Sequence, residues 1–186
     1  MPDIFTLEES MFYEGINVSY DLPRTVNRGT DGSAFTVKLS DRVYATIEDL
    51  KIRITSSTDL SYFQSFYSSY LGTSFLTRWP DNWYRLLEAV GTGNGTNKLF
   101  YLDNYYPYNY LVYLNGVLQT ETTHYVVTGS TGLITFVTAP GNGVAVTVTY
   151  SFRRLSQFSG GYQISPRTFG TSNNQIVSVS LFEVPN

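Results

Sequence analysis

Short apolar runs separated by glycine-containing turns fill the second half of the chain and restrict it to β structure. The dipeptide Asn115-Gly116 joins two of these runs, and it prefers the type I′ turn of a two-residue β-hairpin. Further runs at 125–128, 133–138 and 144–150 predict a second hairpin and a strand with alternating valines. We therefore expect a small β-sandwich or barrel over residues 90–152.

Alternating apolar residues in the first third predict strands of another sheet. The apolar side chains of 35–39 and of 50–54 alternate with polar ones. Residues 24–33 are rich in glycine and other turn formers, and we interpret them as a mobile loop. The run 176–182 predicts one more strand, which cannot be stable alone and which we expect to complete the first sheet.

One helix is predicted between these strands. Thr58 is placed to cap its N-terminus, and Leu60, Phe63 and Tyr67 follow at helical spacing. Gly72 stands where a C-terminal cap is expected.

These elements define a mainly β fold class with two domains. We expect a discontinuous β-sandwich or barrel core domain formed by residues 1–89 and 153–186, carrying the one short helix. Residues 90–152 would be a small β-sandwich-like domain inserted into it.

The composition narrows the possible functions. Charged residues make up 15% of the chain, against about 25% in typical soluble domains, so we expect a surface that packs against other subunits. A net charge of −3 argues against nucleic acid as a partner, and no apolar run is long enough to insert into a membrane. There is no cysteine. The N-terminus lacks the pattern of a secretory signal, so we expect synthesis in a cytoplasm.

Most residues that could act in catalysis or bind a cofactor are better explained by a structural role. His124 is the single histidine and has no Gly-x-Ser-x-Gly partner motif, so we interpret it as a strand-edge or turn residue. The glycine-rich stretch 91–95 lacks a following Lys-Ser/Thr and is interpreted as a turn, not a nucleotide site. The candidate carboxylates are scattered at ends and turns: Glu8, Glu9, Asp41, Glu48, Asp49, Asp81 and Glu121. We therefore expect no enzyme activity, no cofactor and no metal site.

Two aromatic groups are candidates for contacts with a partner. Tyr105, Tyr106, Tyr108 and Tyr110 surround Pro107 and could pack within the domain, form a protein interface or stack on a glycan. Trp79 and Trp83 flank a turn, and paired indoles of this kind more often close a core than bind a ligand.

Residues 90–152 resemble a module of phage structural proteins. The resemblance rests on 91–96 with 100–102, on 111–119, and on Tyr125-x-Val127 with 132–136 and Ala139-Pro140. The whole chain shows a second resemblance. Over nearly its full length, the order of helix, aromatic strand, insert and terminal strand resembles that of the conserved phage tail family, which includes distal tail (Dit-like) proteins of gene transfer agents and tailed phages.

The resemblance implies a structural role in the virion, at the tail tip or baseplate. Members of this family form a ring of six subunits that joins the tail tube protein to the baseplate hub proteins, and the insert decorates its periphery. A homo-oligomer with those partners is therefore expected. The alternative is a receptor- or glycan-binding module of a tail fibre.

Overall fold

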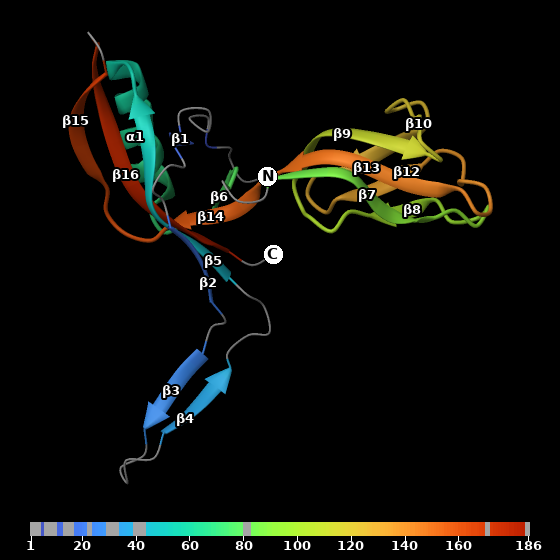
Figure 1. The fold of residues 1–186 in the computed structure, drawn as a ribbon, viewed down its shortest axis with the longest axis horizontal. Coiled ribbons are helices and arrows are strands. Elements are labelled where there is room, and N and C mark those ends of the chain that lie inside the picture. Colours follow the sequence, from blue (N-terminus) through green and yellow to red (C-terminus); the bar gives the residue numbers. More distant parts are fainter. Residues whose placement is uncertain are drawn as a thin grey trace. The chain divides into compact units, whose positions relative to one another are not determined.

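A computed structural model gives the fold of the chain (Figure 1). The residues that it describes are 5, 11–12, 17–21, 24–28, 34–38, 44–79, 83–169 and 172–184. Their contacts divide the chain into two units, Arg78–Arg154 on one side and Pro2–Thr77 with Leu155–Asn186 on the other. The structure is mainly β and its sheets are open, with no closed barrel, which confirms the predicted fold class.

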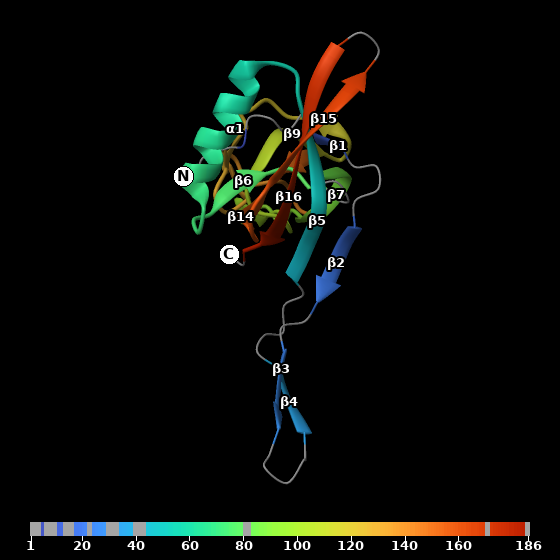
Figure 2. The ribbon, with the colours of Figure 1, turned by 90° about the vertical axis from the view of Figure 1, so that its left-hand side faces the viewer.

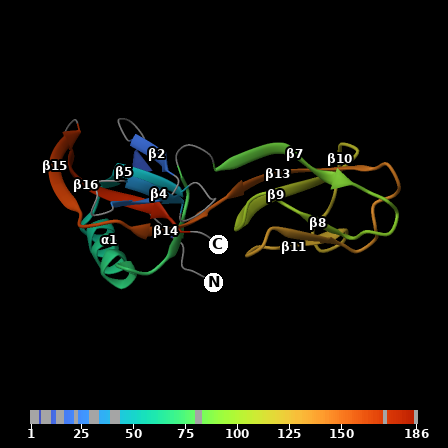
Figure 3. The ribbon, with the colours of Figure 1, turned by 90° about the horizontal axis from the view of Figure 1, so that it is seen from below.

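The unit 78–154 is a β-sandwich of two antiparallel sheets (Figure 3). One sheet has the order β10-β9-β13-β7 and the other the order β11-β12-β8. The strands are β7 (Tyr84–Thr92), β8 (Leu99–Tyr101), β9 (Pro107–Leu114), β10 (Val117–Leu118), β11 (Tyr125–Thr128), β12 (Leu133–Phe136) and β13 (Ala145–Phe152). The boundary expected at residue 90 falls inside β7.

Alternating side chains from both sheets fill the core of the sandwich. Val146, Val148 and Tyr150 point inward from β13, and Ile134 and Phe136 meet them from β12. Each fully buried side chain of this kind contributes about 1.5–3 kcal/mol of transfer free energy. The other buried members of the core are Phe100, Leu102, Val112, Tyr125 and Phe152.

The turns of the sandwich form as the sequence predicts. Asn115 and Gly116 have φ angles of 48° and 81°, so the hairpin from β9 to β10 has the positive φ values of a type I′ turn. The Asn115 side chain also accepts a hydrogen bond from the Ala145 amide at 2.8 Å. The predicted hairpin of β11 and β12 is present as well.

The second unit contains a seven-stranded antiparallel sheet with the order β1-β5-β16-β14-β6, in which β15 pairs with β16 and β2 with β5 (Figure 2). Its strands are β1 (Met11–Phe12), β2 (Asn17–Asp21), β5 (Tyr44–Ile54), β6 (Phe75–Thr77), β14 (Arg154–Phe158), β15 (Gln163–Phe169) and β16 (Ser172–Glu183). Leu50, Ile52 and Ile54 are buried, as their alternation predicts. The C-terminal strand β16 pairs with β5 and so completes the first sheet, which was also expected.

The helix α1 (Ser57–Tyr70) begins earlier than predicted. Its N-cap is Ser56 and not Thr58, because Asp59 stands three residues after Ser56 and completes a capping box. The Ser56 hydroxyl accepts from the Asp59 amide at 3.0 Å, and the Asp59 carboxylate accepts from the Ser56 amide at 3.1 Å. Gly72 follows the helix with a φ of 81°, so the predicted C-terminal signal is confirmed.

Aromatic side chains attach the helix to its sheet. Phe63 and Phe66 are the buried residues of α1, and the Phe66 ring lies 5.1 Å from the rings of both Phe5 and Phe75. The Phe158 ring from β14 lies 4.7 Å from the Phe75 ring. This aromatic layer takes the place of the aliphatic stripe that usually binds a helix to a sheet.

The expected loop over residues 24–33 is wrong in its first half. Arg24–Arg28 form β3, which pairs in antiparallel register with β4 (Ala34–Lys38) as a separate two-stranded sheet. Thr25 and Val26 are β-branched and favour a strand once a partner strand is present. Residues 29–33 lie outside the described residues, as does Leu39 of the predicted strand.

Candidate functional site

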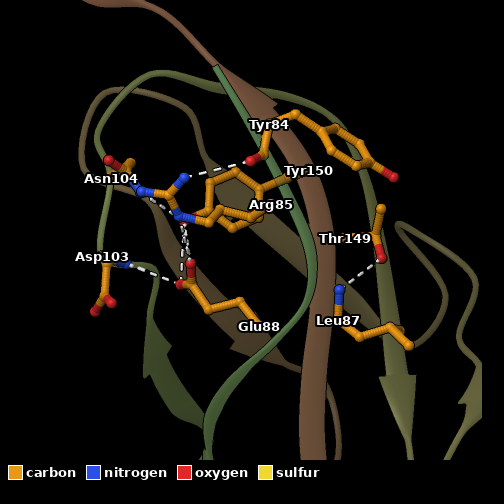
Figure 4. Close-up of polar contacts among 8 residues, drawn as sticks. All are labelled: Tyr84, Arg85, Leu87, Glu88, Asp103, Asn104, Thr149 and Tyr150. Carbon is orange, nitrogen blue, oxygen red and sulfur yellow. Dashed lines mark hydrogen bonds and ion pairs between the residues drawn. The ribbon is translucent and has the colours of Figure 1, made fainter. Parts of the chain in front are cut away.

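A cluster of polar side chains spans the sandwich where β7, β13 and the segment after β8 meet (Figure 4). The Tyr150 hydroxyl lies 3.0 and 2.9 Å from the two carboxylate oxygens of Glu88 and donates to them. It also accepts from the Asn104 side-chain amide at 2.9 Å. Arg85 forms an ion pair with Glu88, Nε to Oε2, at 3.4 Å, and the Asp103 amide donates to Glu88 at 3.3 Å.

A bulge in β7 brings the two charged residues onto one face. In the register with β13, Glu88 stands opposite Val148 and Arg85 opposite Tyr150, so Leu86 and Leu87 together oppose a single residue. Leu87 has a φ of 50°, and its amide donates to the Thr149 hydroxyl at 3.1 Å. The extra residue turns Arg85 and Glu88 both toward the core side of the sheet.

The cluster keeps Tyr150 neutral. Burial raises the pKa of Tyr150 well above its usual value, the hydrogen bond from Asn104 lowers that pKa, and the bond to Glu88 raises it again. A neutral phenol donating to a carboxylate is a strong hydrogen bond, but it is neither a base nor a nucleophile. Glu88 is 13% exposed and already carries four contacts within the chain. The arrangement therefore fixes the chain before β9 to the sheet.

The four tyrosines of 105–110 are divided between different surroundings. Asn109 has a φ of 50° and lies in a bulge of β9, so Tyr108 stays opposite Ser151 on the outer side while Tyr110 turns to the core side. Tyr110 packs against the core and donates a short hydrogen bond to Glu121. Burial, with the bond to Glu121, raises the pKa of Tyr110 to about 12.

Tyr105, Tyr106 and Tyr108 do not share the contact that Tyr110 makes with the core. The Arg153 guanidinium lies 4.0 Å from the centre of the Tyr108 ring, a cation–π distance. The Arg153 amide donates to the Tyr106 carbonyl at 3.2 Å, and Tyr106 has a φ of 54°. Tyr105 is exposed. The geometry thus gives no single platform of four rings.

His124 is a turn residue, as predicted. It is exposed, and its Nδ1 accepts from the Thr120 amide at 3.0 Å while its own amide donates to the Thr120 carbonyl at 2.8 Å. Its ring nitrogen is thus used to close the turn before β11.

Gly91 and Thr92 end β7, and residues 93–95 begin the turn that was predicted over 91–95. The Gly93 amide donates to the Val144 carbonyl at 2.8 Å and the Gly95 amide to the Pro140 carbonyl at 2.9 Å. These amides are the donors that a phosphate loop would have to offer, and they are already bound within the chain.

The remaining candidate residues that the structure describes are not grouped into a catalytic or metal-binding site. Trp79 is fully buried, with the Arg154 guanidinium 5.1 Å from its ring, as expected for an indole that closes a core. Within the described ranges no group of three or more His, Asp or Glu could hold a metal ion. The candidate carboxylates Glu8, Glu9, Asp41 and Asp81 lie outside the described residues.

The pairing of Glu88 with Tyr150 was missed by the sequence analysis. The two charged residues of the strand 84–92, Arg85 and Glu88, are the signal that could have drawn attention to it, because a charge on the core side of a strand needs a partner. The partner of Glu88 could not be named, since the bulge that selects Tyr150 has no sequence signature of its own.

No family model and no curated protein matches the chain. In the described part of the chain, none of the helices has the length and apolarity needed to cross a membrane.

Proposed function

We propose that this chain is a non-enzymatic structural subunit of a bacteriophage tail tip. Copies of it would assemble into a ring, six in number, between the tail tube and the baseplate hub. The six-fold ring and its neighbours come from the resemblance of the sequence to the phage tail family. Self-association is what the geometry supports.

The observation that carries the proposal is the two-stranded sheet of β3 and β4. Its strands have five residues each, and among the described residues they pair only with each other. A hairpin of two strands is marginal in water without a third strand or a covering face. Within the described ranges no further strand pairs with its outer edges, and the neighbouring subunit of a ring would supply such a strand.

The order of the elements supports the same proposal. The chain leaves the seven-stranded sheet after β6 and re-enters it at β14, and the sandwich is built from the residues between them. A discontinuous core domain that carries a complete inserted domain is the arrangement that the resemblance implies. The polar cluster of Glu88 and Tyr150 is fully used within the chain, so the geometry favours a structural part over a catalyst.

The test is the mass of the assembly with and without the hairpin. Light scattering across protein concentration is expected to give the mass of six chains for the natural sequence. Replacing residues 24–38 by a short Gly-Ser linker should reduce that mass, while the blue-shifted emission of buried Trp79 shows that the fold is retained. A monomer or trimer at every concentration would contradict the ring. A monomer that binds host polysaccharide would support the fibre module instead.

A further inference from the structure

On the outer face of the four-stranded sheet of the sandwich no strand residue is charged, and the one charge beside it is that of Arg153, whose guanidinium lies on the Tyr108 ring. Val146, Val148 and Tyr150 point to the core, so Thr147, Thr149 and Ser151 lie on the opposite side of the sheet, where Thr149 and Ser151 are nevertheless buried. Their cross-strand partners extend the face over β9, β10 and β7. Its exposed large side chains, called here the sheet face, are Tyr84, Leu86, Leu87, Leu111 and Leu118.

Large apolar side chains are exposed on the sheet face. Leu86 is 69% exposed, Leu87 53%, Leu118 54%, Tyr84 46% and Leu111 44%. Together these five present on the order of 500 Å² of surface, at the upper end of the largest apolar patches found on monomers. A standard protein interface buries about 800 Å² on each partner. These five side chains therefore supply more than half of the area of one side of such an interface.

The edges of this sheet are poorly suited to pairing with another strand. The strand β10 at one edge has two residues. The strand β7 at the other edge is interrupted by the bulge at Leu86 and Leu87, which twists the strand and breaks its row of free amides. We therefore expect the sandwich to associate through the face of this sheet and not through its edges.

The chemistry of the face selects its partner. A partner with charged residues would have them desolvated against leucine and tyrosine without a counter-charge, which costs several kcal/mol for each ion. A suitable surface is apolar and has few charges. The sheet face of a second copy has both properties, and two such faces can meet about a two-fold axis.

We propose that the sheet face is a self-association site, on which the same face of a second copy packs. This inference goes beyond the ring, because the ring contact is assigned to the β3–β4 hairpin and the face contact to the sandwich. The contact would link sandwich units in pairs. Arg153, whose guanidinium lies on the Tyr108 ring, would stand at one end of the buried area.

The first test introduces a charge at the middle of the face. Leu111→Lys in the full chain is expected to weaken self-association at least tenfold, measured by sedimentation velocity over a concentration series. The matched control is Leu99→Lys on β8 of the other sheet, where the exposed fraction of 45% is close to the 44% of Leu111. The control should stay within twofold of the natural chain. Equal effects of the two variants, or none from Leu111→Lys, would overturn the proposal.

The second test uses the absence of cysteine from the sequence. Under mild oxidation Leu111→Cys should give a disulfide-linked dimer in high yield, and Leu99→Cys should not. Rings of six without the Leu111 cross-link would leave the proposed function standing and reject the face contact. Cross-linked dimers without rings would support the face contact and reject the proposed ring. Binding of a glucan oligosaccharide that Leu111→Lys abolishes, by a chain that stays monomeric, would assign the face to sugar instead.

Discussion

Tyr150 joins three parts of the sandwich through one hydroxyl group. It donates to Glu88 on β7, accepts from Asn104 after β8, and its ring lies in the core. Because both partners are partly buried, neither can replace this contact with water without cost. The residue therefore sets the position of the chain before β9 as well as filling space.

We predict that Tyr150→Phe keeps the fold and lowers its stability. Phenylalanine preserves the ring but leaves Glu88 and Asn104 without their shared partner, which should reduce the free energy of unfolding by about 1–3 kcal/mol. Urea unfolding followed by tryptophan fluorescence measures the change. The control is Tyr113→Phe on the outer side of the same sheet, where we expect less than about 0.5 kcal/mol. Equal losses in the two variants would show that the cluster adds nothing.

The stability should also fall in alkaline solution. Burial raises the pKa of Tyr125 and of Tyr150 and brings that of Tyr110 to about 12, each above the usual value of 10.0. Above about pH 10 the unfolded chain loses these protons while the folded chain keeps them, so folding loses stability as the pH rises toward the folded pKa values. Below about pH 9 these groups should have no effect.

Unfolding curves at pH 8, 10 and 11, with tyrosinate absorbance at 295 nm, measure this dependence. Tyr150→Phe should make the alkaline loss smaller than in the natural chain. A free energy of unfolding that is the same at pH 8 and pH 11 would contradict the assignment of these three tyrosines.

At the scale of elements, the turn between β7 and β8 shows why a glycine-rich stretch can be structural. A Cβ atom on Gly93 would lie 2.4 Å from the Gly141 carbonyl oxygen and 2.5 Å from that of Pro140. The two loops close on each other through backbone hydrogen bonds, and a side chain at Gly93 would separate them.

Gly93→Ala is therefore predicted to destabilise the sandwich by about 1–3 kcal/mol or more, through overpacking against the backbone. Gly141→Ala is the matched control in the facing loop, since its Cβ would meet only a Val144 methyl group at an ordinary 3.6 Å. Thermal unfolding of the two variants compares them directly. If Gly141→Ala were the more damaging change, the close approach at Gly93 would not be what constrains this turn.

Local sequence signals predicted some elements correctly and others wrongly, and each error has a physical reason. Asn115-Gly116 fixes its turn by itself, because only a few residue types tolerate two positive φ angles. The sequence pattern predicts a cap at Thr58 because Ser56 and Thr58 are both good capping residues, and only Asp59, three residues after Ser56, distinguishes the two by completing the capping box. The strand β3 was missed because its turn-forming neighbours outweighed a pairing that only the fold supplies.

At the scale of the whole chain, long-range pairing decides what local patterns cannot. The strand β16 pairs with β5 although more than a hundred residues of sequence separate them. The pairing could be predicted only because a single terminal strand is not stable without a sheet. The polar cluster and the sheet face could not be predicted in the same way. Both depend on bulges in β7 and β9 that shift register by one residue and so change which side chains face the core.

Both surfaces proposed for assembly, the β3–β4 hairpin and the sheet face, lead to the same expectation for the intact particle. Bacteriophage particles labelled with a gold-conjugated antibody against this chain, and imaged by electron microscopy, test that expectation most directly. We expect label at the tail tip, in several copies per particle. Particles without label, or label confined to single copies elsewhere on the virion, would contradict it.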